Sequence, residues 1–154
     1  MSEFDVLFVD DDENILSAIK RNLNGKFKVC TVFDVTEAIG MLKKNNFPII
    51  VSDMKMPKIN GADFLSIVKK HSPNSVRILL SGESTRDDII TCINECQIYK
   101  FLSKPCPPAV LEETLKDAYQ HYKNNMLQKD EVDITVKGVT QVIASMHKFF
   151  LPEI

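Results

Sequence analysis

Short apolar runs of strand length alternate five times with stretches of helical periodicity, and this alternation constrains the fold more than any other feature. The runs fall at residues 4–9, 27–32, 48–52, 76–80 and 98–102. Strands that are separated by helices pair in parallel through right-handed crossovers. The sequence therefore predicts an α/β fold: a three-layer, doubly wound, five-stranded parallel sheet, followed by an extra C-terminal helical segment.

Polar residues and glycines mark where the helices are expected to begin and end. Gly25 is expected to close the first helix, Thr36 to cap the second, and Gly61 to open the third. Ser84 or Thr85 is expected to cap the fourth helix. Apolar residues recur at helical spacing in the last two helices, at Ile89, Ile90 and Ile93 and then at Leu111, Leu115, Ala118 and Tyr122.

The composition is that of an ordinary globular protein of 154 residues, long enough for one domain and a short extension. A net charge of −2 provides no general attraction to nucleic acid or to an anionic membrane. No apolar run approaches the roughly 20 residues that span a bilayer, and the N-terminus lacks an apolar signal core. These features predict a cytoplasmic protein that contacts no membrane and, within this chain, no nucleic acid.

The four cysteines allow two interpretations. Cys92 and Cys96 would share a helix face, and Cys106 or His121 would complete a metal site with them. However, no C-x-x-C pair is present. We therefore expect the cysteines to be small apolar side chains in a reducing compartment.

Chemically reactive side chains follow four of the five predicted strands. In doubly wound sheets, reactive groups gather just beyond the carboxyl ends of the strands. The groups that arrive there are Asp10, Asp11 and Asp12 from the first strand, Asp53 from the third, Ser81 from the fourth, and Lys104 from the fifth. The sequence thus predicts one pocket that contains carboxylates, a hydroxyl and an amine.

This set of groups suits phosphoryl transfer assisted by a divalent cation. Clustered carboxylates repel one another, and a hard cation with oxygen ligands, such as Mg²⁺, relieves that repulsion. Asp53 would attack phosphorus in line and form an acyl phosphate. Lys104 would neutralise one phosphoryl oxygen, and the Ser81 hydroxyl would donate a hydrogen bond to another.

Four motifs resemble those of the response-regulator receiver family, and the resemblance covers residues 4–125. The motifs are FVDDD at residues 8–12, VSDMKMP at 51–57, LSG at 80–82 and FLSKP at 101–105. The resemblance implies a flavodoxin-like receiver fold. It identifies Asp53 as the phosphoacceptor, with Ser81 and Lys104 as its catalytic partners.

The same resemblance implies further roles. Asp10 and Asp11 would be the acidic metal pair, and the main-chain carbonyl of Lys55 would be a further Mg²⁺ ligand beside Asp53. The bond before Pro105 is expected to be cis. Phe101 occupies the family's switch position, which is often Tyr, and would rotate inward when Ser81 moves.

In function, the resemblance implies a signalling switch rather than an ordinary enzyme. The phosphoryl group would come from a sensor histidine kinase or a phosphotransfer protein. The receiver would catalyse its own phosphorylation and dephosphorylation, and would control an attached output domain or a partner protein, with a homodimer as one form. A stand-alone receiver that signals through protein contacts is the alternative for the whole protein.

The tail after the receiver has its own pattern. Residues 126–134 are expected to extend the last helix and form a polar hinge, and residues 135–154 to form an amphipathic helix. That helix would be either the start of a truncated output domain, which we favour, or a dimerisation helix. Residues 94–99 and 135–139 resemble regulators whose receiver precedes an HD-type metal-dependent phosphohydrolase, which would lie beyond residue 154.

Other function classes fit the sequence less well. A flavodoxin-type electron carrier would need a polar phosphate loop where this chain has three aspartates, which would repel a flavin phosphate. A phosphatase with an aspartyl nucleophile would use a D-x-D motif after the first strand and leave Asp53 without a role. No G-x-x-x-x-G-K-[ST] loop for nucleotide phosphates is present, and residues 129–154 contain no helix-turn-helix pair for DNA.

Overall fold

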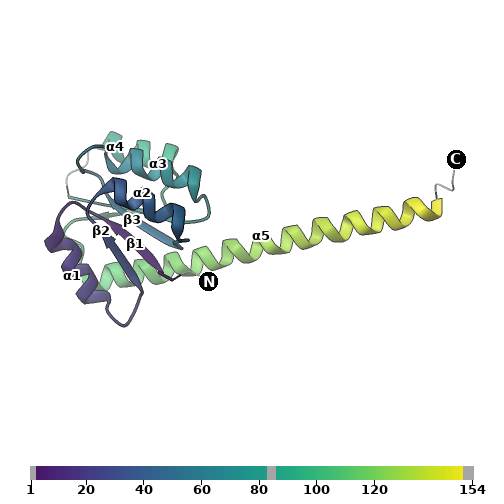
Figure 1. Ribbon diagram of the computed structural model, residues 1–154, viewed down its shortest axis with the longest axis horizontal. Coiled ribbons are helices and arrows are strands. Elements are labelled where there is room, and N and C mark those ends of the chain that lie inside the picture. Colours follow the sequence, from purple (N-terminus) through teal and green to yellow (C-terminus); the bar gives the residue numbers. More distant parts are fainter. Residues whose placement is uncertain (1–2, 83–85, 151–154) are drawn as a thin grey trace. The chain divides into compact units, whose positions relative to one another are not determined.

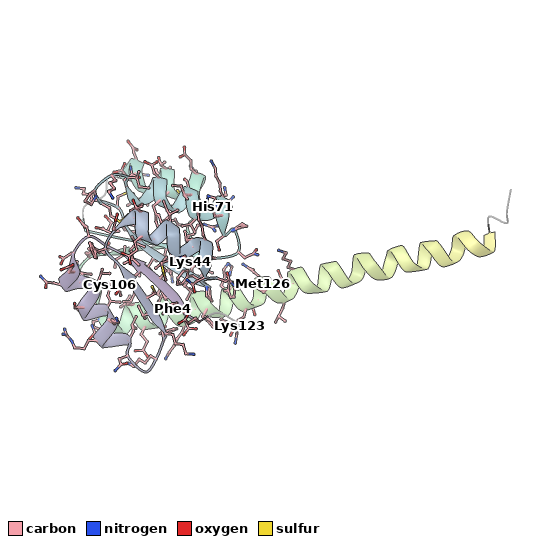
Figure 2. All side chains as sticks on the ribbon, viewed as in Figure 1. Phe4, Lys44, His71, Cys106, Lys123 and Met126 are labelled. Atoms are coloured by element: carbon pink, nitrogen blue, oxygen red, sulfur yellow. The ribbon has the colours of Figure 1, made fainter. Side chains whose placement is uncertain are left out.

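A computed structural model describes residues 3–82 and 86–150 of the chain, with side chains described up to residue 129 (Figures 1 and 2). The strand bounds agree with the predicted runs to within two residues. In chain order the elements are β1 (Val6–Val9), α1 (Glu13–Leu23), β2 (Val29–Val32), α2 (Val35–Lys44), β3 (Ile49–Asp53), α3 (Gly61–His71), β4 (Val76–Ser81), α4 (Arg86–Thr91), the π-helix η1 (Cys92–Cys96), β5 (Lys100–Ser103) and α5 (Pro108–Phe150).

The five strands form one parallel sheet in the order β2-β1-β3-β4-β5. This order confirms the predicted doubly wound fold. The central strand β3 is buried along its whole length, as its unbroken apolar run predicts. Because the strand order reverses beside β1 and β3, the carboxyl ends of these two strands open onto one crevice.

Two apolar clusters cover the two faces of the sheet and make the predicted three layers (Figure 1). One cluster packs α1 and the first turns of α5 against the sheet and includes Leu16, Leu115 and Ala118. The other packs α2, α3 and η1 against the opposite face, with Phe64 and Leu65 fully buried. These layers hold the strands rigidly, so that the loops at their carboxyl ends start from fixed positions.

Acidic or amide side chains cap the N-terminal ends of α1, α2 and α3. Asp12 accepts a 2.9 Å hydrogen bond from the backbone N–H of Asn14 and so begins α1. The predicted cap at Thr36 is wrong, because Asp34 caps α2 by accepting from the Thr36 backbone N–H at 3.1 Å. A carboxylate is a strong acceptor for the free N–H groups of a first turn. The expected caps of the fourth helix lie outside the described residues.

The fourth helix changes its hydrogen-bonding pattern partway along. It begins as α4 and continues as the π-helix η1 from Cys92 onward. Ile90 and Ile93 are 43% and 51% exposed, whereas Cys92 and Cys96 are fully buried. The cysteines therefore provide the packed face, which supports their interpretation as small apolar side chains.

The chain divides into two compact units, Met1–Tyr122 and Lys123–Ile154. In the first unit, α5 contributes Leu111, Leu115 and Ala118 to the core. In the second unit the backbone is helical through to Phe150, including residues 126–134, whose role as a hinge stays a prediction. Within the described residues, no helix is both long enough and apolar enough to cross a membrane.

Candidate functional site

Four strand ends bring the predicted site residues to one edge of the sheet. In register, Val9 lies beside Ser52, Asp53 beside Leu80, and Ser81 beside Ser103. The next residue along β5, Lys104, donates its backbone N–H to the Ser81 carbonyl at 2.9 Å. The side chains of Asp10, Asp53, Ser81 and Lys104 therefore start from neighbouring backbone positions.

Three carboxylates from two of these strand ends form a tight cluster. Asp10 and Asp53 are buried, with 3% and 7% of their surface exposed, and Asp11 is exposed. One oxygen from each lies within 4.8 Å of the others. Charges at such distances repel strongly unless a cation lies between them. An all-oxygen set with one open, exposed side suits a hard divalent cation that keeps several waters.

Lys104 links the two buried carboxylates. Its Nζ lies 2.7 Å from Asp10 Oδ2 and 3.3 Å from Asp53 Oδ1, and its side chain is 20% exposed. Burial opposes the charged form of this amine. The hydrogen bond and charge of Asp10, with the charge of Asp53, outweigh burial and raise the pKa of Lys104. The amine is therefore a stable positive charge that is directed at the oxygens of the acidic cluster.

The electrostatic environment of Asp53 differs from that of a surface carboxylate. Burial, and then the charge of Asp10, raise the pKa of its carboxyl, and the Lys104 charge only partly compensates. The ionised form is thus under-stabilised in the metal-free protein. A cation or an added phosphoryl group that changes this charge balance would act directly on Asp53.

A close backbone approach holds the end of β3 in place. The Gly61 N–H, at the start of α3, donates to the Met54 carbonyl at 2.7 Å. A Cβ at Gly61 would lie 2.9 Å from the Asp53 carbonyl carbon and closer still to the carbonyl oxygen. Only glycine fits here without a shift of the backbone that carries Asp53. The sequence alone predicts Gly61 only as the start of a helix, and no local pattern signals this second role.

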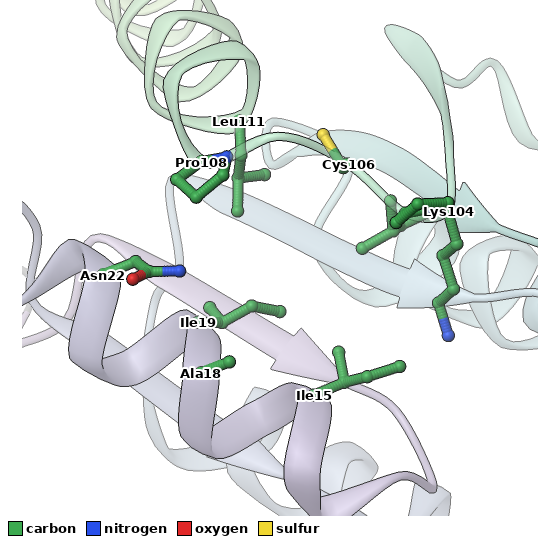
Figure 3. A pocket seen from close by; sticks show the side chains of 10 residues that line it. Ile15, Ala18, Ile19, Asn22, Lys104, Cys106, Pro108 and Leu111 are labelled. Carbon is green, nitrogen blue, oxygen red and sulfur yellow. The ribbon is translucent and has the colours of Figure 1, made fainter.

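Two hollows adjoin the site. Asp11 and Lys55 line a pocket of about 490 Å³ together with Met54, Met56, Pro57, Asn60 and Asp88. A second, mainly apolar cavity of about 390 Å³ lies between α1 and the start of α5 (Figure 3). Ile19 faces Leu111 across it, and Ile15 and Lys104 lie towards one end. The first pocket gives the acidic cluster its open side.

The remaining predicted residues lie as follows. Ser81 is buried at the end of β4. Phe101 is half-buried and packs against the cluster beneath α3 and η1. The bond between Lys104 and Pro105 is cis. Asp12, the third acid after β1, caps α1.

Asp53→Asn is expected to stabilise the metal-free protein at neutral pH. A group whose folded-state pKa is raised stabilises the fold below its unfolded pKa, and this contribution is lost as the pH rises through the folded value. The neutral amide avoids that loss. The difference between variant and wild-type protein should therefore shrink as the pH falls into the ordinary carboxyl range.

Thermal unfolding with a chelator, from about pH 7 down to pH 4, measures this difference. Asp117→Asn, at an exposed position of α5, is the matched control and should change the stability by less than about 0.5 kcal/mol. Mg²⁺ should stabilise wild-type protein, by about 2.7 kcal/mol at a hundredfold excess over its Kd, and stabilise Asp53→Asn much less. If Asp53→Asn were less stable than wild type at every pH tested, the raised pKa assigned to Asp53 would be contradicted.

Known proteins resemble this chain in sequence and structure. The sequence family described as response regulator receiver domain matches residues 6–116. The hydrogenase transcriptional regulatory protein HoxA of Bradyrhizobium diazoefficiens is 38% identical over 125 residues, which are 81% of this chain and 25% of HoxA. The chain therefore spans about a quarter of that relative's length.

Two solved structures match nearly over their whole length. The signal receiver domain of an HD domain-containing protein from Pseudomonas fluorescens Pf-5 has a TM-score of 0.77 and 28% identity, covering 82% of this chain and 93% of that chain. The beryllofluoride-activated NtrC4 receiver domain dimer has a TM-score of 0.71 and 34% identity, covering 76% of this chain and 97% of that chain.

Proposed function

The chain belongs to the response regulator receiver domain family of two-component signalling, and we propose that Asp53 is its phosphoryl acceptor in a Mg²⁺-dependent reaction. The observation that carries this assignment is the position of Lys104 Nζ, which contacts both Asp10 and Asp53. No other described lysine forms an ion pair with two buried carboxylates. Asp53 is also the buried acid whose pKa its surroundings raise.

The transfer exchanges one bond to phosphorus for another. A carboxylate oxygen of Asp53 attacks the phosphorus of a phosphohistidine, the P–N bond breaks, and the imidazole nitrogen keeps the electron pair. The product is an acyl phosphate on Asp53. The donor is a sensor histidine kinase or a phosphotransfer protein in this proposal.

The surrounding residues stabilise charge on the phosphoryl group. Asp10, Asp11, Asp53 and the carbonyl of Lys55 would hold Mg²⁺, which supplies positive charge to the phosphoryl oxygens when bound. Lys104 exchanges its contact with Asp53 for a phosphoryl oxygen, and its raised pKa keeps it charged. The Ser81 hydroxyl donates a hydrogen bond to another oxygen.

Phosphorylation then shifts the population of conformations. It adds roughly two negative charges and three acceptor oxygens at the end of β3. Ser81 and Lys104 are drawn towards these oxygens, and Phe101 fills the space behind Ser81. The surface formed by α4, β5 and α5 changes with them, so that partners are bound or released.

The output of the whole protein belongs to this proposal as well. The resemblance to a receiver from an HD domain-containing protein supports an output of that type, whereas HoxA is described as a transcriptional regulatory protein. A stand-alone receiver that acts through protein contacts is the alternative.

The NtrC4 receiver, solved as a dimer, supports a homodimer on activation. Four free thiols support a cytoplasmic location.

Intact-mass measurement after incubation with phosphoramidate and Mg²⁺ tests the acceptor. Wild-type protein should gain one phosphoryl group, and Asp53→Asn and a Mg²⁺-free sample should gain none. Asp117→Asn removes a carboxylate far from the cluster along the sequence and should react like wild type. A folded wild-type protein that gains no phosphoryl group, or an Asp53→Asn variant that still does, would overturn the assignment.

A further inference from the structure

A buried arginine lies in β4, at the opposite end of the strand from Ser81. Arg77 is 8% exposed, and among the described residues its guanidinium donates only to main-chain carbonyls. Nε donates to the Cys96 carbonyl at 2.8 Å, Nη1 to those of Ser75 and Pro73 at 2.9 and 3.2 Å, and Nη2 to that of Gln97 at 3.4 Å. No carboxylate among the described residues forms an ion pair with it. A buried charge without a counter-ion must gain its stabilisation from these dipoles.

Two of these carbonyls belong to the C-terminal end of η1 and the residue that follows it. The free carbonyls at a helix C-terminus carry partial negative charge, which a buried cation stabilises. A second cation acts nearby, because Lys69 Nζ donates to the Glu95 carbonyl at 3.3 Å. Gln97 then leaves the helix with φ of 50°, in the left-handed region. Arg77 therefore ties this turn directly to the central sheet.

Side-chain packing holds η1 against α3. Cys92 and Cys96 are fully buried, and Cys96 Sγ donates to the Ala62 carbonyl at 3.1 Å and lies 3.3 Å from Ser66 Oγ. On the strand side, the Arg77 carbonyl accepts from the Tyr99 backbone N–H at 2.6 Å. Both ends of the connection from η1 to β5 are thus attached to β4 through one residue.

The helix that precedes η1, α4, is much less buried than η1. None of the residues of α4 is buried, and Ile90 is 43% exposed. The hydrogen-bonding pattern changes from α to π at Cys92, and such changes often mark places where a helix can bend. Segments with few buried contacts open at lower free energy than packed ones. The continuous helical segment of residues 86–96 therefore has a weakly packed first half, α4, and an anchored second half, η1.

We propose that Arg77 is a positioning residue that anchors η1 to β4, so that phosphorylation moves α4 about the junction at Cys92 while η1 stays in place. The proposal rests on the proposed function for its trigger, because the movement begins at Ser81. An anchored η1 keeps the movement of α4 from spreading into η1, and the Phe101 backbone stays in register with Leu79 on β4. Without the guanidinium, four carbonyls would lose a charged donor, and η1 would move with α4.

Hydrogen exchange of the full chain, read by mass spectrometry with and without beryllofluoride and Mg²⁺, tests this. In wild-type protein, activation should change exchange in residues 86–91 and leave residues 92–96 unchanged. Arg77→Met keeps the apolar stem but removes the donors. It should speed exchange of residues 92–96 about tenfold before activation, and activation should then also change these residues. Arg77→Lys, which keeps the charge, should fall between the two.

Lys26→Met removes an exposed lysine that pairs with Glu112 and is the matched control, with no expected effect on η1. The proposal is overturned if activation changes residues 92–96 of wild-type protein as much as residues 86–91. It is also overturned if Arg77→Met leaves exchange of η1 at the wild-type rate. If the proposed function were wrong, beryllofluoride would not change hydrogen exchange in any part of the protein. The comparison of wild type with Arg77→Met before activation would still test whether Arg77 anchors η1.

Discussion

Gly61→Ala is expected to destabilise the fold by more than about 2 kcal/mol, although alanine normally stabilises a helix relative to glycine. The added Cβ would collide with backbone atoms of Asp53 and Met54 rather than with a flexible side chain. Relief requires that the start of α3 move away from the end of β3. The 2.7 Å hydrogen bond from the Gly61 N–H to the Met54 carbonyl would lengthen as a result.

The same shift should reduce phosphorylation, because it displaces the backbone that carries Asp53. Urea unfolding measures the stability, and intact mass with phosphoramidate measures the reaction. Gly40→Ala is a close control. A Cβ at Gly40, inside α2, would meet nothing within 4 Å, so this change should stabilise the protein by about 0.5–1 kcal/mol. Equal effects of the two substitutions would show that the close approach at Gly61 imposes no constraint.

Lys104→Met should lower the rate of Asp53 phosphorylation by about 10²–10³-fold, the usual effect of removing one group that stabilises transition-state charge. The apolar stem, which lines the cavity beside α1, is largely preserved. The amine that contacts Asp10 and Asp53 is lost. Phosphorylation rates with phosphoramidate at saturating Mg²⁺ measure this effect. Lys104→Arg keeps the charge and should retain more activity than Lys104→Met.

Lys104→Met should also destabilise the metal-free protein in a pH-dependent way. At neutral pH it leaves the Asp10 and Asp53 carboxylates without their cation. Because the pKa of Asp53 is raised, this carboxyl takes up a proton at a higher pH than an ordinary carboxyl does. The loss of stability caused by removing the amine then decreases as the pH falls. Lys26→Met removes a half-exposed ion pair and should change stability by less than about 1 kcal/mol at any pH. A loss of stability independent of pH would show that Lys104 acts through packing alone.

The site residues could be predicted because a simple rule connects them. Apolar runs identify the strands, and each strand of a parallel sheet delivers its next residue to the same edge. Asp10, Asp53, Ser81 and Lys104 follow from this rule without knowledge of any contact. The choice of a hard cation follows equally from the residue types. The cap of α2 was misassigned because Asp34 and Thr36 are both suitable acceptors, and the local sequence does not decide which backbone N–H groups are free.

The sequence by itself determined the order of elements, the doubly wound sheet and the residues at its reactive edge, because periodicity and strand ends are local properties. Only the tertiary structure decided which of the acids are buried, that Lys104 contacts two of them, and that Gly61 passes against the Asp53 backbone. It also decided that Arg77 holds the carbonyls that end η1. Burial, desolvation and close backbone approach depend on segments far apart in the chain, and no local pattern records those distances.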